Sequence, residues 1–182
     1  MNPVRPLKAC LAALALGAAT AASASTALPF PEWVFVEGGM AHRGGSLASV
    51  GLGWRLPWGG ATPVGRFSSR LEAHVTRWSL PTDRDGRWRT GQLVLVPLVR
   101  HTWQTVLAPL FVEGGIGVSY LHDPAPDAST RWNFHDTVAI GALVGPLQRY
   151  ELSLRLVHQS NAGLRKPNPG MNSVQLRFAL AF

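Results

Sequence analysis

The sequence is almost without cysteine, since Cys10 is the only one it contains. Cys10 stands at the start of an apolar run, whereas the lipid-bearing cysteine of a lipoprotein would follow such a run. It also falls inside a leader segment that we predict to be removed. The remaining chain then has no cysteine, so no disulfide can hold it together in an oxidising compartment.

The leader prediction rests on the first residues of the chain. Arg5 and Lys8 give a positive start, residues 9–18 are apolar and uncharged, and residues 22–24 fit an A-x-A cleavage motif. This order is typical of a secretory signal peptide. We predict that residues 1–24 are the signal peptide and that residues 25–182 form a single domain.

Long hydrophobic runs are also missing. No segment after the leader has the 18 or so consecutive apolar residues of a membrane-spanning helix. The chain has no phosphate loop, no dinucleotide fingerprint and no zinc-ligand spacing. The sequence therefore predicts neither a metal nor a cofactor.

Acidic residues are fewer than basic ones. Arg5 and Lys8 account for two of the 17 basic residues, so the rest of the chain carries 15 against 10 acidic residues. An exported protein rarely meets nucleic acid, and anionic lipid head groups are the more natural partner. The alternative is that the arginines line a polar interior or flank a membrane.

Segments of about ten residues, in which apolar residues alternate with polar or small ones, are the main pattern in the rest of the sequence. The clearest lies at the C-terminus, where large apolar residues take every even position from Val174 to Phe182. Alternation with period two is the signature of a strand with one apolar face. Eight such segments predict an all-β, eight-stranded antiparallel transmembrane β-barrel of the outer-membrane type. We expect strands near residues 33–42, 46–56, 66–79, 87–102, 107–121, 133–144, 148–160 and 172–182.

Charged residues fall on the polar parity of several predicted strands. Glu37 and Glu113 are expected to point into the barrel, because small barrels fill their interiors with side chains. Buried charges need partners, and we expect inward Arg55, Arg155 and Arg177 to supply them. Such a narrow, filled barrel has no through-channel, so the sequence does not predict a pore function.

The seventh predicted strand places a histidine and a serine on its apolar face. Leu152, Leu154 and Leu156 set the parity, and His158 and Ser160 continue it. Residues two apart on a strand are about 6.5–7 Å apart at Cα, so the imidazole and the hydroxyl can meet. If both termini lie in the periplasm, this pair lies at the extracellular rim and faces lipid. A hydroxyl beside a general base suits attack on a lipid ester.

The segment from His158 to Gly170, HQSNAGLRKPNPG, resembles the signature of the PagL-type lipid A 3-O-deacylases. These are eight-stranded outer-membrane barrels that hydrolyse the 3-position acyl ester of lipid A. The close match covers about the last 25 residues, and the rest of the chain matches in architecture. The resemblance implies that His158 is the general base and Ser160 the nucleophile, with the Gly163 backbone and the Asn168 side chain forming the oxyanion hole.

One position departs from the family pattern. Where the family has a glutamate that orients the histidine, this chain has Asn172, and no acidic residue follows Glu151. An asparagine carbonyl can accept the imidazole N–H but stabilises an imidazolium less than a carboxylate does. Asp136, on the apolar parity of the sixth predicted strand, is an alternative acid. A tight turn near residues 145–146 would place it opposite or diagonal to His158.

The sequence therefore predicts an outer-membrane lipid A 3-O-deacylase that acts on lipopolysaccharide in the outer leaflet. The mechanism needs no cofactor. Two alternatives stay open at this point: a non-catalytic barrel with an adhesive or structural role, and a lipid A acyltransferase. The sequence sets no oligomeric state.

Overall fold

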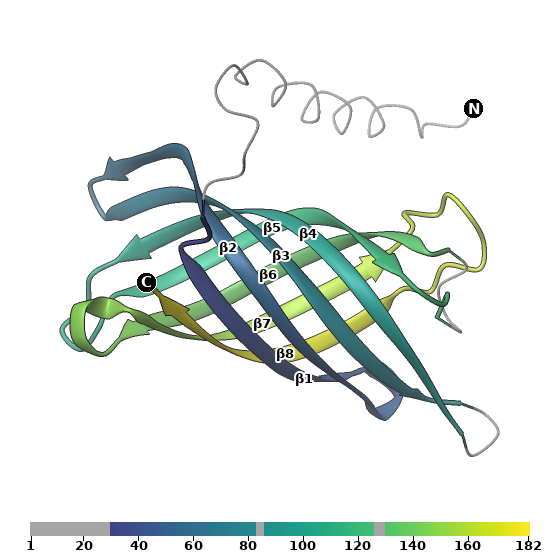
Figure 1. The fold of residues 1–182 in the computed structure, drawn as a ribbon. Helices are drawn as coiled ribbons and strands as arrows, with labels where there is room; N and C mark the ends of the chain where they lie inside the picture. Colours follow the sequence, from purple (N-terminus) through teal and green to yellow (C-terminus); the bar gives the residue numbers. More distant parts are fainter. Residues whose placement is uncertain (1–29, 83–85, 126–129) are drawn as a thin grey trace, which may run out of the picture.

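A computed structural model describes residues 30–82, 86–125 and 130–182 of the 182-residue chain. The predicted signal peptide, residues 1–24, lies outside the described residues. Within them the chain forms eight strands, which close into one barrel in sequence order (Figure 1). The strands are β1 (Trp33–Ala41), β2 (Gly45–Thr62), β3 (Gly65–Pro81), β4 (Arg87–Trp103), β5 (Leu110–Leu121), β6 (Trp132–Val144), β7 (Tyr150–Ser160) and β8 (Met171–Ala181).

All neighbouring strands are antiparallel, and β1 closes the ring by pairing with β8. Two short 3-10 turns, η1 (His42–Gly44) and η2 (Pro146–Gln148), join β1 to β2 and β6 to β7. In the described part of the chain, no helix has the length and apolarity required to cross a membrane. The predicted eight-stranded antiparallel barrel is confirmed.

The barrel has two distinct ends (Figure 1). We call one the termini end, because β1 begins there at Trp33 and the chain finishes there at Phe182. We call the other the loop end, because it carries η1 and the loop of residues 161–170 between β7 and β8. Strand β7 runs from the termini end to the loop end, so its last residue, Ser160, lies at the rim of the loop end.

Strands β2 and β3 are longer than the sequence indicates. The prediction ended the second strand at residue 56, but β2 continues to Thr62 and pairs with the start of β3. The pairing shifts register between Arg55 and Gly59. Such an irregularity bends a hairpin and increases its twist. Figure 1 shows this hairpin extending beyond the barrel at the termini end.

The barrel interior is filled by charged side chains. Four glutamates and four arginines, each at most 7% exposed, form one network of ion pairs. The members are Glu37, Glu72, Glu113, Glu151, Arg70, Arg100, Arg155 and Arg177. Equal numbers of opposite charges satisfy the requirement that a buried charge has a partner. This network fills the interior of the barrel. A binding or catalytic site is therefore expected on the outer surface.

The structure confirms the inward positions predicted for Glu37, Glu113, Arg155 and Arg177. The prediction for Arg55 is wrong. Arg55 lies where β2 leaves the barrel, and its side chain is 70% exposed and pairs with Glu32 at 3.4 Å. The parity count fails there because Arg55 forms the last β2–β3 pair before the register shift, at the end of the regular part of β2.

Candidate active site

Strand β7 presents His158 and Ser160 on the outside of the barrel. Leu154 and Leu156 are 44% and 54% exposed, whereas Arg155 between them is fully buried. Exposed apolar side chains on a barrel of this kind form its lipid-facing surface. His158 and Ser160 continue the outward parity at the loop end, and both are half-buried. The pair therefore lies at the edge of the lipid-facing surface.

His158 has a polar neighbour on each adjacent strand. Its register partners are Asn172 on β8 and Asp136 on β6. The Nδ1 atom of His158 lies 2.7 Å from Oδ1 of Asn172. Because an amide oxygen only accepts hydrogen bonds, this contact places the imidazole proton on Nδ1. The lone pair is then on Nε2, the atom that can accept a proton from a hydroxyl.

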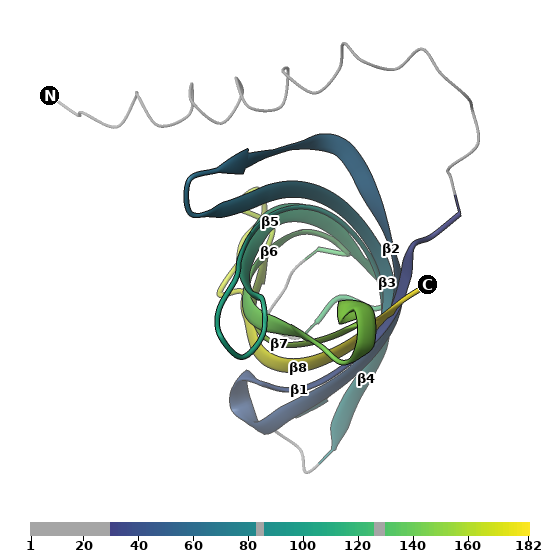
Figure 2. The same ribbon diagram turned by 90° about the vertical axis from the view of Figure 1, so that its left-hand side faces the viewer.

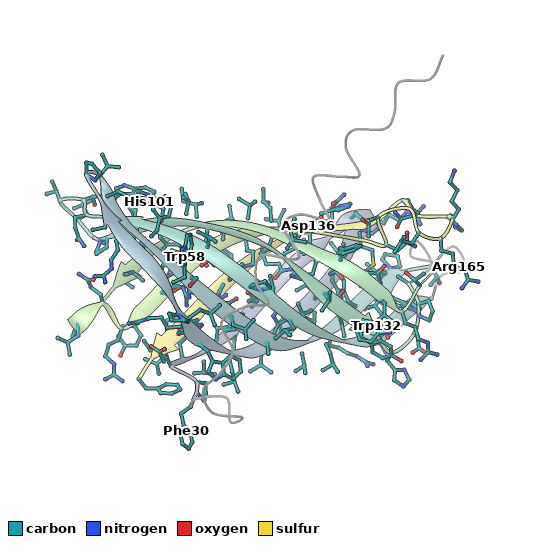
Figure 3. All side chains as sticks on the ribbon, turned by 90° about the horizontal axis from the view of Figure 1, so that it is seen from above. Phe30, Trp58, His101, Trp132, Asp136 and Arg165 are labelled. Carbon is teal, nitrogen blue, oxygen red and sulfur yellow. The ribbon has the colours of Figure 1, made fainter. Side chains whose placement is uncertain are left out.

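Asp136 shares the outer face with His158, and Figure 3 shows it on the outer surface of the barrel. The sequence placed Asp136 opposite or diagonal to His158, and the strand register makes it directly opposite. The hydrogen bond of His158 Nδ1 nevertheless goes to Asn172. Both candidates for the third residue thus flank the imidazole, and Asn172 makes the contact.

The loop after Ser160 is organised by Asn161, a residue to which the sequence analysis assigned no role. Asn161 is 2% exposed, and its backbone carbonyl accepts the Leu164 N–H at 3.0 Å. The two residues inside this turn, Ala162 and Gly163, have positive φ of 53° and 77°. Positive φ at both central positions is the geometry of a type I′ turn. The asparagine before Ala-Gly was the available sequence signal, since asparagine commonly starts turns.

Further contacts of Asn161 tie the loop together. Its side-chain oxygen accepts the Gly163 N–H at 3.0 Å, and its side-chain amide donates to the Arg165 carbonyl at 2.9 Å. Its backbone N–H donates to Oδ1 of Asn168 at 3.0 Å. One buried asparagine thereby sets the conformation of both segments that carry the predicted oxyanion donors.

The two predicted oxyanion donors differ in their present contacts. The Gly163 N–H is used by Asn161, whereas Asn168 bonds Asn161 through its carbonyl end. The amide NH₂ of Asn168 is therefore the end suited to a donor role. The Ala162 N–H also lies close, at 3.4 Å from the Ser160 Oγ.

Gly170 packs directly against the imidazole ring. Its φ is +77°, and a Cβ built there would lie 2.7 Å from His158 Cε1 and 3.3 Å from Nε2. A side chain larger than hydrogen would therefore displace the ring.

We expect Gly170→Ala to lower kcat by about 10²-fold, because a shift of about 1 Å in a catalytic group has that effect. Gly44→Ala is the matched control, since Gly44 has φ +72° and no atom within 4 Å of its Cβ position. Equal losses in both variants would show that backbone strain, not ring displacement, is responsible.

An apolar hollow of about 1040 Å³ lies on the outer face beside His158 and Asn172. A second hollow of about 780 Å³ continues along the same strands toward the termini end. Their apolar walls include Ile116, Val138, Leu156 and Val174 in the first and Ile140, Leu154, Leu176 and Phe178 in the second. Together these hollows, which we call the outer groove, give the polar pair an extended hydrophobic surface beside it.

Across residues 30–82, 86–125 and 130–182, no group of three or more His, Cys, Asp or Glu residues is placed to hold a metal ion. His158 and Ser160 bring an imidazole and a hydroxyl to the same face of β7, and these are the two groups that general-base activation of a serine requires.

Comparison with known proteins identifies the family of the chain. The family model for lipid A 3-O-deacylase (PagL) matches residues 48–181. The lipid A deacylase PagL of Bordetella bronchiseptica is 32% identical over 94 residues, covering 45% of this chain and 52% of that protein. The match thus spans about half of that relative's length. The lipid A deacylase PagL of Pseudomonas aeruginosa is 26% identical over 148 residues, covering 78% of this chain and 82% of that protein.

The fold also has a solved counterpart. A crystal structure of the outer membrane enzyme PagL superposes with a TM-score of 0.71 at 24% identity, covering 82% of this chain and 99% of that one. This likeness supports the barrel fold, and the family model covers most of the sequence, including both His158 and Ser160. The chain therefore belongs to the lipid A 3-O-deacylase (PagL) family.

Proposed function

We propose that the chain hydrolyses the 3-position acyl ester of lipid A, with Ser160 as the nucleophile and His158 as the general base. The observation that carries this proposal is the hydrogen bond from His158 Nδ1 to Asn172, on the lipid-facing side of β7. It leaves Nε2 as the basic atom of the imidazole, and Ser160 follows two residues further along the same face of β7.

The proton and bond changes follow from this arrangement. Ser160 Oγ attacks the ester carbonyl while its proton moves to Nε2 of His158. The tetrahedral intermediate then collapses, and the same proton passes to the sugar oxygen that leaves. A water molecule, activated by His158, releases the fatty acid from the acyl-serine and restores the hydroxyl. Asn172 holds the ring in the tautomer that these steps require.

The negative charge on the intermediate needs donors that are already in place. The Asn168 amide and the Gly163 N–H are the proposed donors, and both are positioned by Asn161. In the free enzyme the Gly163 N–H bonds the Asn161 side chain, so it exchanges that acceptor for the oxyanion. Catalytic hydrogen bonds commonly form only in the substrate complex.

The outer groove supports a lipid substrate. Its walls are almost entirely apolar and face outward, as a binding surface for acyl chains requires. The polar part of lipid A would then lie at the loop end, where Arg165 and Lys166 are exposed. Figure 3 shows Arg165 projecting from that end. Their positive charges suit the phosphates of the lipid A disaccharide.

Mass spectrometry of lipid A tests the proposed reaction. Lipid A from cells expressing the wild-type chain should lack one 3-hydroxyacyl group, and lipid A from cells expressing Ser160→Ala should be intact. Folded wild-type protein in the outer membrane with unchanged lipid A would contradict the proposal. A lipid A species that gains an acyl group would instead identify an acyltransferase.

The third residue of the site can be assigned with two substitutions. We expect Asn172→Ala to lower kcat by about 10- to 100-fold, because the imidazole loses the acceptor that fixes its tautomer. Asp136→Asn keeps the shape of the side chain and removes its charge. If Asp136 stabilises the imidazolium through its charge, Asp136→Asn will lower kcat with little change in KM. Unchanged deacylation by Asp136→Asn would remove Asp136 from the mechanism.

A further inference from the structure

The barrel has a partly open cavity at the end opposite to His158 and Ser160. It has a volume of about 150 Å³ and lies where η2 and the last residues of β8 meet the interior network. Figure 2, which looks at this end, shows the β6–β7 turn across the barrel opening. We call it the mouth cavity, and the residues that matter for its chemistry are Trp33, Arg55, Arg70, Arg100, Arg149 and Glu151.

Positive charge exceeds negative charge around the mouth cavity. Four arginines line it against one glutamate, Glu151. The Oε2 atom of Glu151 is already shared, because it accepts hydrogen bonds from Arg70 at 3.1 Å and Arg100 at 2.7 Å. Arg149 forms no ion pair with any described residue, and its Nε donates to the Ala181 carbonyl. Arg70 and Arg100 also pair with Glu113, and Arg55 pairs with Glu32, so Arg149 is the lining guanidinium that has no carboxylate partner among the described residues.

Two buried donors on the cavity wall lack acceptors. The Trp33 Nε1–H and the Arg70 Nε–H have no hydrogen-bond partner, although these residues are only 5% and 7% exposed. They are neighbours, since the Arg70 guanidinium stacks on the Trp33 ring at 3.8 Å. Leaving a buried donor unpaired costs about 1–3 kcal/mol. One acceptor on the cavity wall, Oε1 of Glu151, also has no hydrogen-bond partner, so the unpaired donors outnumber it and point to a further acceptor in the cavity.

We propose that the mouth cavity binds a phosphate-type oxyanion. Arginine is the residue best suited to phosphate oxygens, because its planar group donates two parallel hydrogen bonds. The cavity volume of about 150 Å³ holds several water molecules at about 30 Å³ each, so a phosphate group fits. The anion is either free phosphate or the head group of a phospholipid in the leaflet at the termini end. This site is separate from the proposed ester hydrolysis, which takes place at the loop end.

Binding of inorganic phosphate to the folded, purified full chain tests the site. The protein is kept in a non-ionic detergent and a phosphate-free buffer, and phosphate is titrated by calorimetry at constant ionic strength. Wild-type protein should bind one phosphate in a saturable manner. Arg149→Gln should weaken this binding about tenfold or more, because a charge-assisted contact is lost at a partly enclosed site.

Two further variants make the test specific. Trp33→Phe keeps an aromatic ring under Arg70 and removes only the unpaired N–H, so it should also weaken binding. Arg66→Gln removes an exposed arginine at the same end that does not line the cavity, and it should bind as the wild type does. Circular dichroism confirms that each variant retains its strands.

The source of the anion is decided by a second titration with short-chain phosphatidylglycerol. Saturable binding of inorganic phosphate that depends on Arg149 and Trp33 supports a free-anion site. Binding of the phospholipid alone, with the same dependence, supports a head-group site. Absence of both, or equal binding by wild type, Arg149→Gln and Trp33→Phe, overturns the proposal, and the cavity then holds water. None of these outcomes depends on deacylase activity.

Discussion

His158→Ala, Ser160→Ala and the double variant are expected to lower kcat to the same residual level, about 10⁴-fold or more below the wild type. Residues that act as one catalytic unit show this lack of additivity, because removing either one stops the same step. If the two side chains contributed independently, the double variant would lose the product of the two single effects.

The physical reason is the order of the proton transfer. In the proposed mechanism serine is a weak nucleophile until a base takes its proton, and the bond to Asn172 leaves His158 Nε2 as the atom that can act as that base. Without His158 the Ser160 hydroxyl is not activated, and without Ser160 the imidazole has no nucleophile to activate. The remaining rate comes from the outer groove and the oxyanion donors, which all three variants retain.

Release of fatty acid from purified lipid A in detergent micelles measures this prediction. Ser46→Ala is the matched control, because Ser46 is an exposed serine at the loop end and does not line the outer groove. It should keep the wild-type rate. A double variant far less active than either single variant would show that His158 and Ser160 do not act in one step.

Glu72→Gln is expected to lower the free energy of unfolding of the barrel by about 3–5 kcal/mol. Glu72 is fully buried, and both of its carboxylate oxygens bond Arg177 at 2.7 Å. Arg155 adds a third contact, at 3.1 Å. Replacing the carboxylate with a neutral amide of the same size leaves two buried guanidinium groups with one fewer negative charge. The effect is large because water cannot compensate inside the barrel.

Urea unfolding of the purified barrel in detergent measures the difference between Glu72→Gln and the wild type. Glu32→Gln is the matched control, because Glu32 is 41% exposed and its ion pair with Arg55 is at the surface. Exposed pairs of this kind contribute about 0–1 kcal/mol. Similar losses in the two variants would mean that the interior network does not hold the barrel together.

Much of the barrel follows from local sequence pattern. In β7 the side chains alternate strictly, so a count from Leu152 places His158 and Ser160 outside and Arg155 inside, as the structure confirms. β4 is the harder case, because it is apolar on both parities. There Val94, Val96 and Leu98 form a small apolar cluster inside the barrel, while the alternate residues face outward.

The pattern is insufficient where the strand leaves the barrel or where the chain turns. Arg55 has inward parity, but β2 bends outward near it and its side chain is exposed. Asn161 follows Ser160 and gives no periodic signal. Its role depends on contacts with Gly163, Arg165 and Asn168, which only the folded loop brings together.

The sequence by itself determined the faces: which residues point outward to lipid, which point inward, and that His158 and Ser160 share the outer face. It could do so because alternation is a property of the extended backbone and requires no knowledge of neighbours. Only the tertiary structure decided what lies beside that pair. Strand register, set by turns and long-range pairing, brings Asn172 and Asp136 to opposite sides of His158 and gives the hydrogen bond to Asn172. The same closure of the ring gathers four arginines around the mouth cavity from strands and a turn that are far apart in the chain.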